Sequence, residues 1–344
     1  MTTVRPQGAR RATVKEVAAL AGVSPKTVSN VLNDFEGVRP QTRERVQAAM
    51  VELDFVPNLA ARGLRNGRSG IIGLALPDLS TPYSAMALQH VVEAARRAGW
   101  GVQVEETGAE PSREHELVAR ARDRLVDGLI LNPIVLERSI VRFGSDLPPV
   151  VLIGEVEDQH VDHVGVDSRA AAADVTAFLV SSGHRRILAL GTAPRAEAAT
   201  AHLRLEGYRD ALAAAGLDED VRLEVHVPAW SPQAAEAAVE RVVADDVRFD
   251  AVFAFTDSMA IGALRALTRA GLRVPDDVSL VGFDDVPLAA SLVPSLTTVA
   301  GDYDDLAATS VRFLGERVAG ATVPPRTHFI AHRIVDREST RSRL

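Results

Sequence analysis

The stretch Thr13–Asn33, TVKEVAALAGVSPKTVSNVLN, decides the fold of the N-terminal part of the chain. Thr13 and Glu16 have the spacing of a capping box, in which the Thr13 hydroxyl accepts a hydrogen bond from the Glu16 N–H and the Glu16 carboxylate accepts one from the Thr13 N–H. Apolar residues then recur at helical spacing until Gly22 interrupts them. The pattern predicts a short helix that begins after Thr13 and ends at Gly22.

A second helix is predicted to follow directly, because Ser24 is a good N-cap and Pro25 suits the first helical position. Two helices joined by a short glycine-containing turn are typical of a helix-turn-helix, which places its second helix in the major groove of DNA. An ordinary helical hairpin is the alternative. Two features favour DNA binding: a third helix around Val46–Leu53 closes a small core, and the second helix carries polar side chains suited to base edges. These side chains are Lys26, Thr27, Ser29 and Asn30.

Charge and composition restrict the possible partners. Residues 1–68 contain eleven Arg or Lys against six Asp or Glu, whereas the whole 344-residue chain has a net charge of −8. A basic head on an acidic body indicates that only the head meets a polyanion. The chain has no cysteine, which excludes disulfides and thiolate metal sites. Its apolar runs are too short to cross a bilayer and no secretory signal is recognisable, so we expect a cytoplasmic, nucleoid-associated protein without membrane contact.

Val14–Asn33 resembles the headpiece of the lactose-repressor (LacI) family, and Val38–Arg43 and Phe55–Asn58 continue the resemblance. Arg39 departs from the serine that usually caps the third helix, and Asn30 stands where many members have Arg. The resemblance implies a DNA-binding headpiece at 13–58, a hinge helix at 59–68 and a homodimer on double-stranded operator DNA. It assigns DNA contacts to Thr13, Ser24, Pro25, Lys26, Thr27, Ser29, Asn30, Asn58, Ala61 and Leu64.

Leu64 matches the hinge residue that members of this family wedge into the minor groove, where it opens a base step and bends the duplex. Packing against the partner's hinge is the alternative role. A tetramer is not expected, because only Val335–Leu344 follow Ile334 and this segment holds no leucine heptads.

After Ser69 the pattern changes to short apolar runs, such as Ile71–Leu76 and Ala251–Phe255, which alternate with amphipathic stretches such as Tyr83–Ala98. This alternation predicts an α/β fold with mostly parallel sheets covered on both faces. Two such sets in succession predict two doubly wound subdomains, a core like that of periplasmic binding proteins. The expected core is 69–341, with an N-subdomain at about 69–166 and 298–326 and a C-subdomain at about 167–297 and 327–341.

Polar residues and one aromatic residue follow the predicted strands, where open parallel sheets bind their ligands. Such a set suits a polyhydroxylated ligand. His184 and Asp284 are interpreted as structural. The His160–His163 segment lacks the spacing of a standard metal site, so a solvated loop is expected there.

The resemblance extends over the body, through segments that include Val126–Ile130, Thr256–Ala263 and Val274–Asp285. It implies a repressor controlled by a small molecule, a sugar or sugar derivative, which Arg204 and Asp257 contact; a salt bridge between these two that only braces the cleft is the alternative. Trp230 and Tyr303 match aromatic residues that line the pocket in sugar-responsive members. Together with the polar residues that follow the predicted strands, the full set of expected effector contacts is Asp78, Tyr83, Asn132, Glu155, Arg204, Trp230, Asp257 and Tyr303.

The effector's identity stays open, because Thr256 replaces a common Asn and Glu155 replaces a common Arg. Whether the effector releases or recruits the protein stays open as well, as do the operator and the regulated genes. Two other classes of protein are the alternatives. A transport-type sugar receptor without DNA function shares the body but has no use for the basic headpiece. An enzyme is disfavoured, since the chain lacks the Walker, H-E-x-x-H and G-x-S-x-G motifs. No cofactor is expected.

Overall fold

The computed structural model describes residues 12–32, 35, 37–55, 68–108, 110–123, 125–134, 139, 141, 147–154, 160–194 and 198–341. They belong to two compact units, Met1–Gly67 and Arg68–Leu344, which are treated separately. Four predicted site residues lie outside the described residues, as does the hinge apart from Arg68. These four are Asn58, Ala61, Leu64 and Glu155.

The first unit contains the helices α1 (Val14–Ala21), α2 (Pro25–Leu32) and α3 (Pro40–Glu52). The capping box is present: the Thr13 N–H donates to Glu16 Oε2 over 2.7 Å, and the Glu16 N–H donates to Thr13 Oγ1 over 3.3 Å. α1 ends at Gly22, whose φ of 63° is the left-handed conformation that favours glycine at a helix end. The sequence prediction of helix, turn and helix is confirmed.

One residue from each helix lies at the centre of this unit. Val17, Val28 and Val46 are completely buried and belong to a single apolar cluster. α3 begins without a side-chain cap, because Arg39 makes no capping hydrogen bond and only Pro40 favours the helix start.

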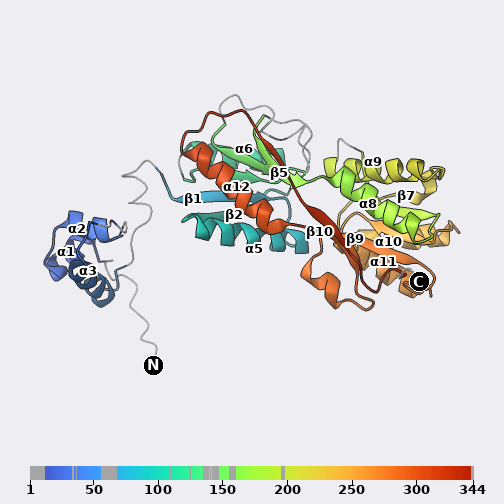
Figure 1. Ribbon diagram of the computed structural model, residues 1–344, viewed down its shortest axis with the longest axis horizontal. Coiled ribbons are helices and arrows are strands. Elements are labelled where there is room, and N and C mark those ends of the chain that lie inside the picture. Colours follow the sequence, from blue (N-terminus) through green and yellow to red (C-terminus); the bar gives the residue numbers. More distant parts are fainter. Residues whose placement is uncertain are drawn as a thin grey trace. The chain divides into compact units, whose positions relative to one another are not determined.

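The second unit contains two six-stranded sheets, one in each subdomain (Figure 1). Among the described residues every strand pair is parallel except β10–β12, which is antiparallel. The N-subdomain sheet has the order β11 (Thr327–Ile330), β5 (Asp162–Val166), β4 (Val150–Ile153), β3 (Leu129–Leu131), β1 (Ile71–Leu76), β2 (Gly101–Glu106). The C-subdomain sheet has the order β12 (His332–Val335), β10 (Thr297–Gly301), β9 (Ser279–Phe283), β8 (Ala251–Ala254), β6 (Ile187–Thr192), β7 (Glu224–His226).

Helices cover both faces of the C-subdomain sheet, with α8 packed on α9 on one face and α10 on α11 on the other (Figure 1). In the N-subdomain α5 packs against α12. The helices are α5 (Pro82–Arg97), α6 (Pro111–Arg122), α8 (Ser168–Ser181), α9 (Ala199–Ala214), α10 (Pro232–Ala244), α11 (Asp257–Arg269) and α12 (Tyr303–Val318), with 3-10 turns at Val221–Leu223 and Pro287–Ser291. The apolar run Val221–Val227 is one of those that predict a strand, but only Glu224–His226 form β7, since the 3-10 turn precedes it.

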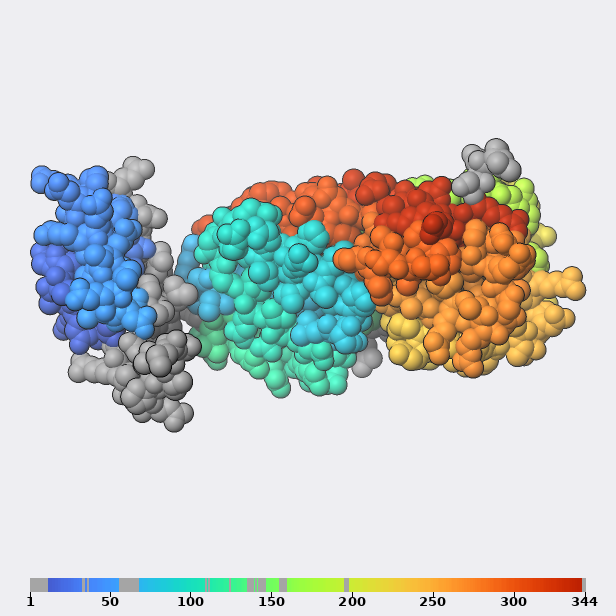
Figure 2. Space-filling view, turned by 90° about the horizontal axis from the view of Figure 1, so that it is seen from below, coloured from blue at the N-terminus to red at the C-terminus, as the bar shows by residue number. Residues whose placement is uncertain are grey.

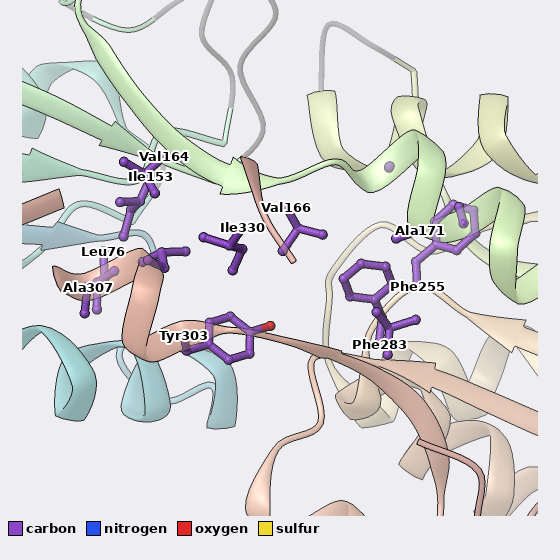
Figure 3. Close-up of a cluster of buried hydrophobic side chains, with 14 of the residues drawn as sticks. Leu76, Ile153, Val164, Val166, Ala171, Phe255, Phe283, Tyr303, Ala307 and Ile330 are labelled. Carbon is purple, nitrogen blue, oxygen red and sulfur yellow. The ribbon is translucent and has the colours of Figure 1, made fainter. Parts of the chain in front are cut away.

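The chain crosses between the subdomains three times, after β5, after β10 and between β11 and β12. In Figure 2 the C-terminal residues, coloured orange to red, accordingly lie along both subdomains of this unit. The second and third crossings differ from the predicted boundaries: β10 pairs in the C-subdomain sheet, and β11 pairs in the N-subdomain sheet. Figure 3 shows one apolar cluster with side chains from both subdomains, and Val166, Ile330 and Tyr303, one from each crossing, lie in the middle of it.

The expectation of a solvated loop at His160–His163 is wrong for Asp162 and His163. Asp162 and His163 begin the buried strand β5. Asp162 is compatible with burial because Arg317 and Arg326 both pair with its carboxylate, at 2.9 and 3.0 Å. Among the described residues no helix is long and apolar enough to span a bilayer.

Candidate functional site

α2 presents the polar face that the sequence predicted. Its apolar residues Val28 and Val31 are buried against the other two helices. The predicted DNA-contacting residues described here are exposed or half-buried: Thr13, Ser24, Pro25 and Lys26 are exposed, and Thr27, Ser29 and Asn30 are half-buried. The start of α2 is fixed, since the Thr27 N–H donates to Ser24 Oγ over 3.1 Å.

A cavity of about 440 Å³ lies where the strands of both sheets end, and we call it the strand-end pocket. Asp78 follows β1 and Asn132 follows β3, so both reach it from the N-subdomain. Trp230 and Thr256 reach it from the C-subdomain. This is the position in which open parallel sheets bind ligands. Six predicted effector residues line the pocket: Asp78, Tyr83, Asn132, Arg204, Trp230 and Tyr303.

Arg204 is a buried cation in the pocket wall, with 4% of its surface exposed. Its Nε donates to Ser168 Oγ over 3.1 Å, and its Nη1 donates to the Phe255 carbonyl. The guanidinium carbon lies 3.4 Å from the centre of the Phe283 ring. Stacking and hydrogen bonding thus hold the planar donor group in one orientation beside the pocket.

Two tyrosines lie next to each other in the wall. The Tyr83 and Tyr303 rings are 6.0 Å apart and meet edge to face at 71°. Burial raises the pKa of Tyr303 well above its ordinary value, so its hydroxyl stays protonated. Together with Trp230 these rings give the pocket aromatic surfaces from both subdomains.

Asp257 occupies a different place from the one predicted, since it is fully buried and is not among the residues that line the pocket. Its Oδ1 accepts a hydrogen bond from the Thr298 hydroxyl over 2.6 Å, and its Oδ2 accepts one from the Val286 N–H over 2.9 Å. Burial raises the pKa of Asp257 to about 7, although these hydrogen bonds oppose the rise. The structure therefore favours a structural role for Asp257 over direct effector contact, through Thr298 and Val286 and not through the alternative salt bridge with Arg204.

Asp284 was interpreted as structural, yet it lines the strand-end pocket. It directly follows β9, and its φ of 112° lies in the left-handed region that non-glycine residues seldom adopt. Such strain concentrates at ligand sites. The signal was present in the sequence, because Asp284 follows a predicted strand in the same way as Asp78 does. His184, also interpreted as structural, is buried beside Asp250 at 3.4 Å.

Comparison with known proteins gives matches along almost the whole chain. Residues 13–58 match the family described as "Bacterial regulatory proteins, lacI family", and residues 176–340 match "Periplasmic binding protein-like domain". The HTH-type transcriptional regulator CelR of Thermobifida fusca is 33% identical over 339 residues, which cover 96% of this chain and 98% of that protein.

Two solved structures have the same fold. The lac repressor dimer bound to operator and the anti-inducer ONPF has a TM-score of 0.79 at 28% identity, and the match covers 97% of this chain and 100% of that one. A CelR–cellobiose complex has a TM-score of 0.70 at 30% identity, and the match covers 96% of this chain and 100% of that one. With a helix-turn-helix unit, two doubly wound subdomains and a relative 33% identical over nearly its full length, this chain belongs to the lacI family of bacterial regulatory proteins and is a DNA-binding transcription regulator.

Proposed function

We propose that the protein is a homodimeric repressor on operator DNA and that a neutral sugar in the strand-end pocket changes its affinity for that DNA. The observation that carries this proposal is a pocket at the strand ends in the same chain as a helix-turn-helix unit. Two relatives support it: one was solved as a dimer on its operator, and another with cellobiose. Turnover of the sugar is not expected, because the relatives named above are regulators. DNA as the partner places the protein in the cytoplasm, at the nucleoid.

The charges around the pocket favour a neutral ligand over a sugar phosphate. Arg204 is the one arginine among the described lining residues, and its donors are partly engaged by Ser168 and Phe255. The carboxylates of Asp78 and Asp284 also line the pocket and would repel a phosphate. Vicinal hydroxyls, by contrast, can donate to a carboxylate and accept from a guanidinium at once. Trp230 and the tyrosines suit the apolar face of a sugar ring.

The three crossings supply the mechanism. A ligand that contacts both subdomains favours the state in which they are closed around it. The crossings after β5, after β10 and after β11 are the segments that absorb such a closure, in the manner of a hinge. The ligand then controls DNA binding if the closed and open states differ in their affinity for DNA. The effector contacts proposed here are Asp78, Tyr83, Asn132, Arg204, Trp230, Asp284 and Tyr303, with Glu155 outside the described residues.

The test uses the full-length protein. Its operator is selected from a pool of random duplexes, and thermal shift is measured with neutral mono- and disaccharides, sugar phosphates and nucleosides. A ligand that binds only the native state raises the melting temperature. We expect a neutral sugar to raise it and to change operator affinity, and sedimentation to show a dimer without tetramer. A sugar that raises the melting temperature of a protein that selects no duplex would favour the receptor without DNA function.

A further inference from the structure

The residues that follow β9 form a strained turn, Asp284–Val286, which we call the Asp284 turn. Asp284 has a φ of 112° and Asp285 a φ of 51°, so two successive non-glycine residues adopt the left-handed region. A non-glycine residue in this region is strained and persists only where its surroundings enforce the conformation. The surroundings of this turn must therefore hold it in place.

Buried acceptors satisfy the consecutive N–H groups of the turn. The acceptors are Val299 O for Asp284 at 2.9 Å, Thr298 Oγ1 for Asp285 at 3.3 Å, and Asp257 Oδ2 for Val286 at 2.9 Å. Val299 and Thr298 belong to β10, the strand that crosses to α12 in the other subdomain. The turn is thus attached to β10 on one side and to the first residue of α11 on the other.

Asp257 joins these attachments, because its second oxygen accepts the Thr298 hydroxyl over 2.6 Å. The close fit extends to Gly282, where an added Cβ would overlap Asp257 Oδ1. The Asp285 side chain has a different partner from its backbone, since its carboxylate accepts a hydrogen bond from Arg337 Nη2 over 2.6 Å. The buried Asp257 carboxyl therefore accepts hydrogen bonds both from the backbone of the turn, at Val286, and from the Thr298 hydroxyl. That hydroxyl also accepts a hydrogen bond from the turn, at Asp285.

We propose that Asp257 is a positioning residue: together with Thr298 it holds the Asp284 turn so that the Asp284 side chain stands in the wall of the strand-end pocket, and it couples this turn to β10. The inference rests on the proposed function only in naming that pocket as the effector site. A ligand that contacts Asp284 is thereby linked, through the Asp284 turn, to β10, the strand that crosses to the N-subdomain.

The test is hydrogen exchange of the full-length protein without ligand, followed at the Asp285 and Val286 amides. Asp257→Ala removes the acceptor of the Val286 N–H and the hydrogen-bond partner of the Thr298 hydroxyl, and Thr298→Val removes the acceptor of the Asp285 N–H. We expect at least about tenfold faster exchange at these amides in each variant. Asp257→Asn keeps an acceptor oxygen for the Val286 N–H, and its amide N–H can donate to Thr298 Oγ1 in place of the bond that Asp257 accepts, so this variant should retain the protection. Thr176→Val is the matched control, because Thr176 is also fully buried in this subdomain but its hydroxyl bonds to Ala172 O within α8.

Two results would overturn the proposal. One is wild-type protection of the turn in Thr298→Val and Asp257→Ala. The other is an equal loss of protection throughout the C-subdomain in Thr298→Val and in Thr176→Val, which would reveal general destabilisation. Because no sugar or DNA is present, failure here leaves the proposed function untouched. Failure to find an effector likewise leaves this result interpretable. If Asp257→Ala does not fold, Thr298→Val and Asp257→Asn still decide the matter.

Discussion

The Thr298 hydroxyl donates a hydrogen bond to Asp257 Oδ1 over 2.6 Å, and both side chains are fully buried. This contact joins the first turn of α11 to β10, and hence the wall of the strand-end pocket to a strand that crosses between the subdomains. Asp257 accepts hydrogen bonds from Thr298 and from the Val286 N–H, and a carboxyl buried with so few donors is costly to ionise. The protonation of Asp257 should therefore make the stability of the protein depend measurably on pH.

The stability of the protein should fall as the pH rises towards 7 because of Asp257. Its pKa is raised from 3.8 to about 7 in the folded chain, so the folded state holds this proton more firmly than the unfolded state does. The contribution is complete below pH 3.8 and is lost as the pH rises through about 7. Burial causes the rise in pKa and the charge of Asp285 adds to it, whereas the hydrogen bonds from Thr298 and from the Val286 N–H and the charge of Arg337 oppose it.

Asp257→Asn should remove this slope, which is up to about 1.4 kcal/mol per pH unit for one proton. The measurement is urea unfolding of the wild type and of the variant between pH 5 and pH 8. The unfolding free energy of the variant minus that of the wild type should increase with pH up to about pH 7 and then level off. Curves that stay parallel over this range would show that Asp257 is ionised throughout.

Asp162 should have the opposite pH dependence. Burial opposes its charge, but hydrogen bonds from Arg317 and Arg326 outweigh burial and lower its pKa from 3.8 to about 2. Its contribution to stability is present above pH 3.8 and is lost as the pH falls to about 2. Asp162→Asn should cost about 3–5 kcal/mol at pH 7, because it leaves the partly buried Arg317 without the carboxylate it pairs with and leaves Arg326 with Glu316 alone.

The control for Asp162 is Asp276→Asn, which removes an exposed partner of Arg273. Exposed pairs contribute about 0–1 kcal/mol. Equal destabilisation by the two substitutions in chemical unfolding at pH 7 would contradict a structural role for the buried cluster.

Arg204→Lys should weaken effector binding at least about tenfold, because a lysine keeps the charge but loses the planar fork and its stacking on Phe283. Operator affinity without effector should stay as in the wild type. Arg209→Lys is the matched control on the same helix, since Arg209 pairs with Glu224 and does not line the pocket. Calorimetry with the sugar found by thermal shift checks this. Equal affinity in the two variants would place the effector away from Arg204.

Lys26→Ala should weaken operator binding by about 1–3 kcal/mol if the exposed side chain at the start of α2 reaches a base edge. Lys15→Ala, which changes the chain's only other lysine, is the control for a lost positive charge. Fluorescence anisotropy on operator and on random duplex measures both. If the two variants bind the operator equally well, α2 is not docked through its first turn.

The sequence predicted the headpiece and most of the pocket because both follow from local rules. Thr13, Glu16 and Gly22 determine the ends of a helix by themselves, and Asp78 and Asn132 follow apolar strands directly. Asp257 was misplaced by one position: Thr256 caps α11 and lines the pocket, whereas the next residue turns inward by a helical step. Sequence spacing does not resolve that step.

The crossings could not be predicted from local patterns. β11 and β12 are four residues each and are separated by Ala331 alone, yet they pair in different sheets. Likewise β5 begins with Asp162 and His163, whose polarity indicates a loop until the distant Arg317 and Arg326 are known to pair with the aspartate. Long-range partners decide such segments.

Control of DNA affinity by a ligand in the strand-end pocket is measured by titrating labelled operator with full-length protein, with and without the sugar found by thermal shift, for the wild type and for Asp284→Asn. The sugar should change wild-type operator affinity by about 5- to 150-fold and should change that of Asp284→Asn much less at the same concentration. If operator affinity is unchanged while calorimetry shows the sugar bound to the wild type, the pocket does not control DNA binding.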